Sequence, residues 1–157
     1  MSAHELATWR ALVDTTAELR RILGARLLQE SRLSAGDYQV LLALTETTGK
    51  RLRSSELAES IDWERSRLSH HLGRMERRGL IRRDDCAVDS RGAEVSLTED
   101  GARMFRAATA PHMRAIKQNF ADALTTEQFD ALAEILQALH SHLHPESPVA
   151  RTREARP

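Results

Sequence analysis

Residues 65–79, "RSRLSHHLGRMERRG", restrict the fold more than any other stretch of this sequence, because they offer very little apolar surface to bury. Five of the fifteen positions are arginine, and only Leu68, Leu72 and Met75 could face a core. On a helix that turns about 100° per residue, Leu72 and Met75 fall within about 40° of Leu68. The pattern predicts a helix that is anchored along one narrow stripe and open on the opposite side.

The opposite side of this helix carries small, hydrogen-bonding and basic side chains. We call these positions the recognition face: Ser66, Ser69, His70, Gly73, Arg74 and Arg77. Small residues permit a close approach to the major groove of DNA, serine and histidine can reach base edges, and arginine binds guanine or phosphate. A solvated basic surface would give the same pattern in an isolated helix, so the neighbouring elements decide between the two interpretations.

The flanking residues predict a winged helix-turn-helix. Before the arginine-rich helix, "RLRSSELAESID" predicts an extended piece at Leu52 and a short helix capped by Ser54, and two short helices with a tight turn form a helix-turn-helix. After it, Gly79 is a natural helix end. Two β-capable runs, 80–83 and 93–97, then surround a turn and predict a hairpin. In this context, DNA recognition is the favoured interpretation of the recognition face.

Long helices are expected on both sides of this unit. They are predicted at residues 4–30, at 35–47 behind a Ser34 cap, from Thr98 across Pro111, and after a Thr125 cap. Pro111 should kink or interrupt its helix. The last helix has apolar residues at 3,4 spacing that form a packing seam: Phe129, Leu132, Leu136, Leu139 and Leu143.

The predicted fold class is therefore mainly α with a small β-hairpin (α+β), a winged helix-turn-helix flanked by long N- and C-terminal helices. The expected domains are an N-terminal helix (1–33), a DNA-binding lobe (34–98), C-terminal helices (99–144) and a disordered tail (145–157). Within the lobe, the recognition helix is expected at about 64–78 and the wing at about 80–97.

The charge distribution supports a nucleic-acid partner. The net charge of the chain is zero, but residues 50–83 contain ten basic and five acidic residues, as a localised nucleic-acid footprint would. The sequence has no glycine-rich phosphate loop, metal-ligand spacing or nucleophile arrangement, so we expect neither an enzyme nor a cofactor nor a metal site. One cysteine and the lack of a long apolar run predict a cytoplasmic protein without a membrane partner.

The chain resembles the MarR family of winged-helix transcriptional regulators over about residues 6–143. The segments that carry the resemblance are "LSAGDYQVLLAL", "LRSSELAESIDWERSRLSHHLGRMERRGLI", the wing motif "DSRG" and "VSLTEDG". The resemblance implies a homodimer in which both terminal helical regions interlock. It also implies that two recognition helices enter successive major grooves of an inverted-repeat operator, and that the protein is a repressor released by a small-molecule ligand.

The resemblance also assigns roles to individual residues. Residues expected at DNA bases or phosphates are Ser54, Ser55, Arg65, Ser66, Ser69, His70, Arg74 and Arg77. Arg91 at the hairpin tip would enter the minor groove, and Asp89 would brace the wing. Dimer contacts are expected from Leu6, Phe129, Leu132, Leu136, Leu139 and Leu143. Relatives often begin the recognition helix with serine or threonine, whereas this chain has "DWER", in which Trp63 is expected to pack the turn.

Alternative functions remain open from the sequence. The fold could be a winged-helix protein-interaction module without DNA binding. A redox-responsive regulator would use Cys86, although the neighbouring aspartates disfavour its thiolate. A zinc-responsive regulator would use His140, His142 and His144, although no carboxylate or cysteine completes that set. An aromatic or phenolic effector could contact Trp9 and His112, although a core position is the simpler interpretation of Trp9.

Overall fold

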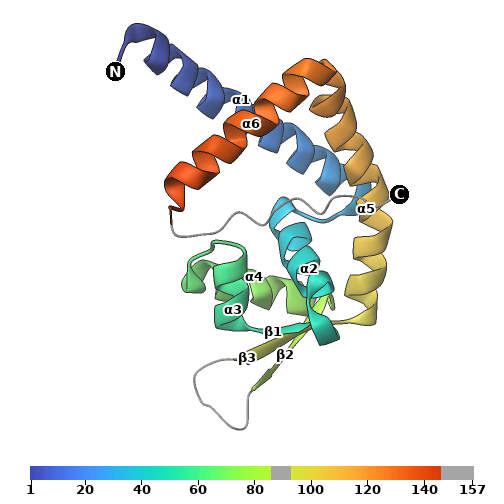
Figure 1. Ribbon diagram of the computed structural model, residues 1–157. Helices are drawn as coiled ribbons and strands as arrows, with labels where there is room; N and C mark the ends of the chain where they lie inside the picture. Colours follow the sequence, from blue (N-terminus) through green and yellow to red (C-terminus); the bar gives the residue numbers. More distant parts are fainter. Residues whose placement is uncertain (86–92, 146–157) are drawn as a thin grey trace, which may run out of the picture. The chain divides into compact units, whose positions relative to one another are not determined.

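A computed structural model describes residues 1–85 and 93–145 of the chain. Its main elements are α1 (Ala3–Ser31), α2 (Ala35–Glu46), β1 (Arg51–Arg53), α3 (Ser54–Ser60), α4 (Arg65–Arg77), β2 (Ile81–Asp85), β3 (Ala93–Leu97), α5 (Glu99–Asn119) and α6 (Thr126–Leu143). Two short 3₁₀ helices, η1 (Thr48–Lys50) and η2 (Ala121–Ala123), complete this set (Figure 1). The order of elements confirms the predicted fold class.

The chain forms two compact units. The first comprises Met1–Ile116 and contains the winged helix-turn-helix, whereas the second begins at Lys117 and contains η2 and α6. The three strands of the first unit form an antiparallel sheet in the order β1-β3-β2. Val95 of the central strand lies opposite Leu52 on one side and Arg83 on the other. The extended piece predicted at Leu52 is therefore the third strand of the wing sheet.

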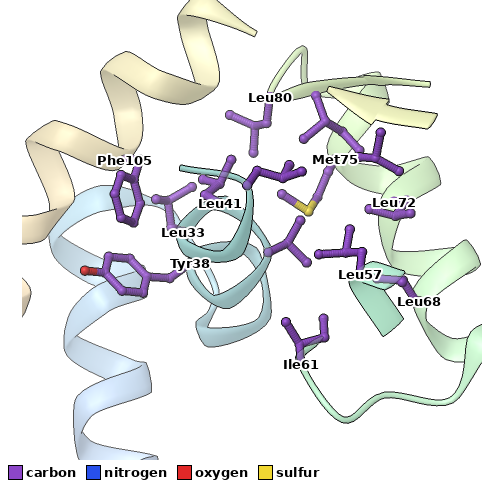
Figure 2. Close-up of a cluster of buried hydrophobic side chains, with 14 of the residues drawn as sticks. Leu33, Tyr38, Leu41, Leu57, Ile61, Leu68, Leu72, Met75, Leu80 and Phe105 are labelled. Atoms are coloured by element: carbon purple, nitrogen blue, oxygen red, sulfur yellow. The ribbon is translucent and has the colours of Figure 1, made fainter. Parts of the chain in front are cut away.

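The core of the first unit lies where α2, α3, α4 and the sheet meet (Figure 2). The three apolar residues of α4, Leu68, Leu72 and Met75, have at most 1% of their surface exposed. They pack with buried side chains from α2 and α3, including Leu41 and Leu57. The narrow apolar stripe therefore anchors the arginine-rich helix, as predicted.

Capping boxes set the beginnings of two predicted helices. At α2, Ser34 Oγ accepts the Asp37 N–H at 3.1 Å, and the Asp37 carboxylate accepts the Ser34 N–H at 2.9 Å. At α6, Thr125 and Gln128 form the same reciprocal pair. Each box satisfies backbone N–H groups that the first helical turn leaves without partners. Gly79, with φ of +71°, follows the end of α4 in the left-handed conformation that glycine tolerates best.

Two local predictions are wrong. Ser54 does not cap α3, because Arg53 is the N-cap and its N–H donates to the Glu56 carboxylate at 3.0 Å. The Ser54 hydroxyl instead donates to the Ala93 carbonyl at 2.8 Å and ties α3 to β3. Pro111 does not interrupt α5, which continues from Glu99 to Asn119, so that part of its prediction is wrong; a kink at Pro111 stays a prediction.

Both long terminal helices leave large apolar side chains uncovered. On α6, Phe129, Leu136, Leu139 and Leu143 are 42–70% exposed. On α1, Trp9 is 58% exposed, so its predicted core position is wrong for the single chain. Among the helices of residues 1–85 and 93–145, none is long and apolar enough to span a membrane.

Candidate nucleic-acid interface

The recognition face is open to its surroundings. Five of its six residues are exposed, namely Ser66, Ser69, His70, Arg74 and Arg77. Gly73, between them, is partly buried. His71, next to His70, is only 8% exposed and belongs to the buried side of the helix. The two adjacent histidines therefore have different environments, as their angular positions on the helix predict.

The exposed arginines of this face are held by contacts within α4. The Arg77 Nε donates to the Gly73 carbonyl at 3.2 Å, and the Arg74 Nη2 lies 2.9 Å from Nδ1 of His71. A guanidinium group always carries its charge and can donate two parallel hydrogen bonds to guanine or phosphate. The face therefore presents fixed positive charge beside small residues that leave room for a groove edge.

A hollow of about 280 Å³ brings several predicted DNA-binding residues together. It lies between the beginning of α3, the first half of α4 and the sheet, and its polar lining comprises Ser54, Ser55, Arg65, Ser69 and Arg83. Four of these five residues were expected at DNA from the sequence. The helix-turn-helix and the wing therefore contribute polar side chains to one hollow, whose lining also includes Leu68, Leu72 and Ala93.

Arg83 is the residue of this hollow that the sequence prediction missed. Its Nε and Nη2 lie 2.8 and 2.7 Å from one carboxylate oxygen of Glu76, whose other oxygen accepts the Arg83 backbone N–H at 2.9 Å. These hydrogen bonds lower the pKa of Glu76. Strand alternation could have located this residue, because Arg83 lies two positions after the buried Ile81 and therefore on the same face of the sheet.

Trp63 packs in the turn between α3 and α4, as predicted. Its backbone N–H donates to the Ala58 carbonyl at 2.9 Å, and its ring meets the ring of His71 edge-on at 5.1 Å between centroids. The guanidinium carbon of Arg67 lies 4.1 Å from the centroid of the indole, in a cation–π contact. Arg67 is thus a second cation, at the flank of the recognition face, that the sequence prediction left out.

A buried polar cluster connects α4 to the corner between α1 and α2. Asp37 is 3% exposed, and its two carboxylate oxygens lie 3.0 Å from His71 Nε2 and 2.7 Å from Arg78 Nη1. Arg78 also donates to the Arg32 carbonyl at 2.6 Å. Burial alone would raise the pKa of Asp37, but its interactions with His71, Arg78 and Ser34 outweigh burial and hold the pKa well below its usual range. Asp37 is therefore an ionised anchor for the recognition helix.

The two predicted effector residues lie on different helices, Trp9 on α1 and His112 on α5. The ring of His112 packs 4.6 Å from the ring of Tyr38, and burial lowers the pKa of His112, although Glu30 acts in the opposite direction. Trp9 is exposed on α1. A shared role of Trp9 and His112 in binding an effector stays a prediction.

Other candidate residues do not complete a metal site, or lie outside the described residues. The rings of His140 and His144 lie 4.7 Å apart near the end of α6. In residues 1–85 and 93–145, no three histidine, cysteine, aspartate or glutamate side chains are grouped to hold a metal ion. Cys86, Asp89 and Arg91 lie outside the part of the chain that the structure describes.

The fold and the exposed face define a winged helix-turn-helix protein of the DNA-binding class. The IclR helix-turn-helix domain model matches residues 38–85. Among curated proteins, the transcriptional regulator HosA of Escherichia coli O157:H7 is 28% identical over 107 residues, which cover 68% of this chain and 77% of HosA.

Two solved structures from Streptomyces coelicolor are more similar. AbsC, a MarR family transcriptional regulator, is 33% identical with a TM-score of 0.81, covering 93% of this chain and 98% of AbsC. Sco3205, a MarR family regulator crystallised in complex with DNA, is 34% identical with a TM-score of 0.83, covering 96% of this chain and 94% of Sco3205. The chain belongs to the MarR family. It is a DNA-binding transcriptional regulator.

Proposed function

We propose that the protein is a homodimeric repressor that binds an inverted-repeat operator and leaves it when a small molecule binds. The observation that carries the proposal is the recognition face itself. It is exposed, basic and rich in small residues, on a helix whose other side is fixed in the core. A protein-docking face would need apolar anchors at its centre, and this face has none among its six residues.

Within this proposal, α4 enters the major groove and the hollow beside it accommodates the sugar-phosphate backbone. Ser66, Ser69, His70, Arg74 and Arg77 contact base edges and adjacent phosphates. Phosphate oxygens bind at the hollow lined by Ser54, Ser55 and Arg65, where Arg83 adds a guanidinium held by two hydrogen bonds to Glu76. Arg91 reaches the minor groove from the wing, with Asp89 as its brace, as the family motif implies.

The uncovered apolar stripe of α6 supports the homodimer. Its exposed residues are Phe129, Leu136, Leu139 and Leu143, each at least 42% exposed. Leu132 is partly covered. Contiguous apolar surface of this kind marks an interaction site. Leu6 on α1 is half-buried and would contribute at the other end of the chain. A second copy covers these residues and places two recognition faces on one DNA duplex, in keeping with an inverted-repeat operator.

A cavity beside the recognition helix supports ligand control. It has a volume of about 810 Å³, and the indole of Trp63 forms its aromatic wall. Its polar lining includes Arg20, Arg67, His71 and Arg74 together with Ser34, Gln39 and Asp62. An aromatic or phenolic compound could stack on this ring and bind a guanidinium. Because Arg74 belongs to both the cavity and the recognition face, a ligand that engages it competes directly with DNA.

The test is operator recognition by matched arginine variants. The wild-type protein is used to enrich a duplex from a random-sequence library, and binding to that duplex is compared with binding to a scrambled duplex of the same length and composition. Arg77→Ala should weaken binding to the enriched duplex by about fivefold or more, because a base or phosphate contact is lost. Arg106→Ala removes an exposed arginine from α5 and should leave binding nearly unchanged. Equal losses in both variants would contradict the assignment of α4 as the recognition element.

A further inference from the structure

His71 lies between the buried anchor of α4 and an exposed arginine of the recognition face. Its side chain is in contact with Asp37 of α2, with Arg74 one turn further along α4, and with the ring of Trp63. The site is closely built around the imidazole: a Cβ at Gly36 would lie 3.0 Å from Cε1 of His71 and 2.7 Å from Cη2 of Trp63. Only a residue without a side chain leaves this space at the beginning of α2.

The contacts of His71 determine which ring nitrogen carries the proton. The guanidinium of Arg74 can only donate hydrogen bonds, so Nδ1 of His71, at 2.9 Å, is the acceptor. In the neutral ring, the proton is then on Nε2, which lies 3.0 Å from the Asp37 carboxylate, although it is not well aligned for a hydrogen bond. Arg78 and Ser34 hold that carboxylate in place. Asp37, His71 and Arg74 therefore form one chain of polar contacts from the core to the surface.

This chain fixes an arginine that is otherwise exposed. A long side chain that is already ordered loses less conformational freedom when it binds a partner. We propose that His71 is a positioning residue for specific DNA recognition, which presents the guanidinium of Arg74 to the groove and withdraws that support when the imidazole becomes protonated. The inference rests on the proposed role of Arg74 at DNA.

A second proton on His71 would lie on Nδ1 and face the guanidinium of Arg74. The acceptor would be lost and two like charges would be placed in contact. The anions around the ring are Asp37 of α2, which is in contact with it, and Asp62 on the wall of the same cavity. The cations around it are Arg74 on α4, Arg78 at its end, and Arg67 and Arg20 on the wall of that cavity. The guanidinium of Arg74 would turn away from the imidazolium, and its fixed orientation toward the groove would be lost.

The exposed His70 has the opposite effect on DNA binding. A proton on His70 adds positive charge to the recognition face and strengthens attraction to any phosphate backbone. Acidification should therefore raise affinity for DNA of unrelated sequence while it lowers the preference for the operator. The ratio of the two affinities removes the general electrostatic contribution, and the His71→Asn variant separates the effect of His71 from that of His70.

The experiment measures this ratio between about pH 8 and about pH 5, the range in which histidines ionise. The probes are the enriched duplex and its scrambled counterpart, at constant ionic strength. His71→Asn places an amide oxygen near the position of Nδ1 and does not titrate, and His4→Asn is the control at an exposed histidine of α1. Arg74→Ala is the second variant, since it removes the oriented group from the surface without touching the core.

For the wild-type protein and His4→Asn, we expect the ratio to fall at least about fivefold on acidification. One good base contact contributes a discrimination of about this factor between sequences. His71→Asn should lose this pH dependence, and Arg74→Ala should have a low ratio at every pH. A pH-independent ratio in the wild type, or a fall as large as the wild-type one in His71→Asn or in Arg74→Ala, would overturn the inference. If His71→Asn does not fold, the pH dependence of the affinity ratio in Arg74→Ala still tests the inference. A wild-type protein that fails to discriminate the duplexes at about pH 8 would overturn the proposed function instead.

Discussion

Gly101 occupies a position at the beginning of α5 where any side chain must collide with backbone. A Cβ at this residue would lie 2.0 Å from the carbonyl oxygen of Leu80, 2.9 Å from its carbonyl carbon and 3.0 Å from Cδ1 of Leu97. The same carbonyl accepts the Thr98 N–H at 3.3 Å. The Thr98 hydroxyl donates to the Gly79 carbonyl at 2.6 Å and accepts the Gly101 N–H at 3.0 Å. The glycine therefore permits the contact between α5 and the segment that joins α4 to the wing.

The change in stability on Gly101→Ala follows from one stabilising effect and two destabilising effects. Alanine favours a helix over glycine by about 1 kcal/mol. Relief of the clash requires α5 or the Leu80 backbone to move, and overpacking of this kind costs about 1–3 kcal/mol. The movement also strains the Thr98 cap, and loss of such a cap costs about 1 kcal/mol. Since backbone atoms cannot rotate away as side chains do, we expect the free energy of unfolding to fall by about 2 kcal/mol.

Urea unfolding at a fixed protein concentration measures this change, because the slope and midpoint together give the free energy of unfolding. Gly24→Ala is the matched control on α1: its Cβ would meet only the Cβ of Ala35, at 4.0 Å. That variant should be as stable as the wild type or more stable by up to about 1 kcal/mol. A Gly101→Ala protein as stable as Gly24→Ala would refute the packing argument at the α5 contact.

Three further substitutions test other parts of the structure. Asp37→Asn should lower the free energy of unfolding by about 2 kcal/mol at about pH 7, since Arg78 and His71 lose a charged partner. The folded pKa of Asp37 is lowered, so the unfolded chain binds its proton first, and the wild-type advantage should shrink in urea titrations as the pH falls below about 4. Leu136→Glu should halve the mass measured by light scattering, because it charges the apolar seam of α6; an unchanged mass would exclude this seam from the dimer. Arg91→Ala should weaken operator binding without changing that mass, and an unchanged affinity would remove the wing from the interface.

Local sequence signals were sufficient for most of the fold. The capping boxes at Ser34 and Thr125 use residues three positions apart, so their partners are readable from the chain itself. The burial of Leu68 and the exposure of His70 follow from helix periodicity in the same way. The helix-turn-helix was predicted from the apolar spacing of α3 and α4 and from the stop signal at Gly79, although the start signal of α3 was placed one residue too late.

Contacts between distant residues were beyond such signals. Ser54 was expected to cap α3, but its hydroxyl donates a hydrogen bond to the Ala93 carbonyl, 39 residues away. The ion pair between Asp37 and Arg78 spans 41 residues. A capping aspartate gives no indication in the sequence that its carboxylate also binds side chains far along the chain. The sequence therefore located the recognition face but not the buried cluster that supports it.

The most direct test of the central claim is the salt dependence of binding to the enriched duplex, measured by titration with the wild-type protein. A recognition helix and polar hollow that contact phosphates should release counterions, so the logarithm of affinity should fall linearly and steeply with the logarithm of salt concentration. The preference over the scrambled duplex should persist across the titration, because base contacts add to the phosphate contacts. Failure to enrich any sequence, or binding that is insensitive to salt and sequence, would contradict the assignment of α4 as a DNA-recognition helix.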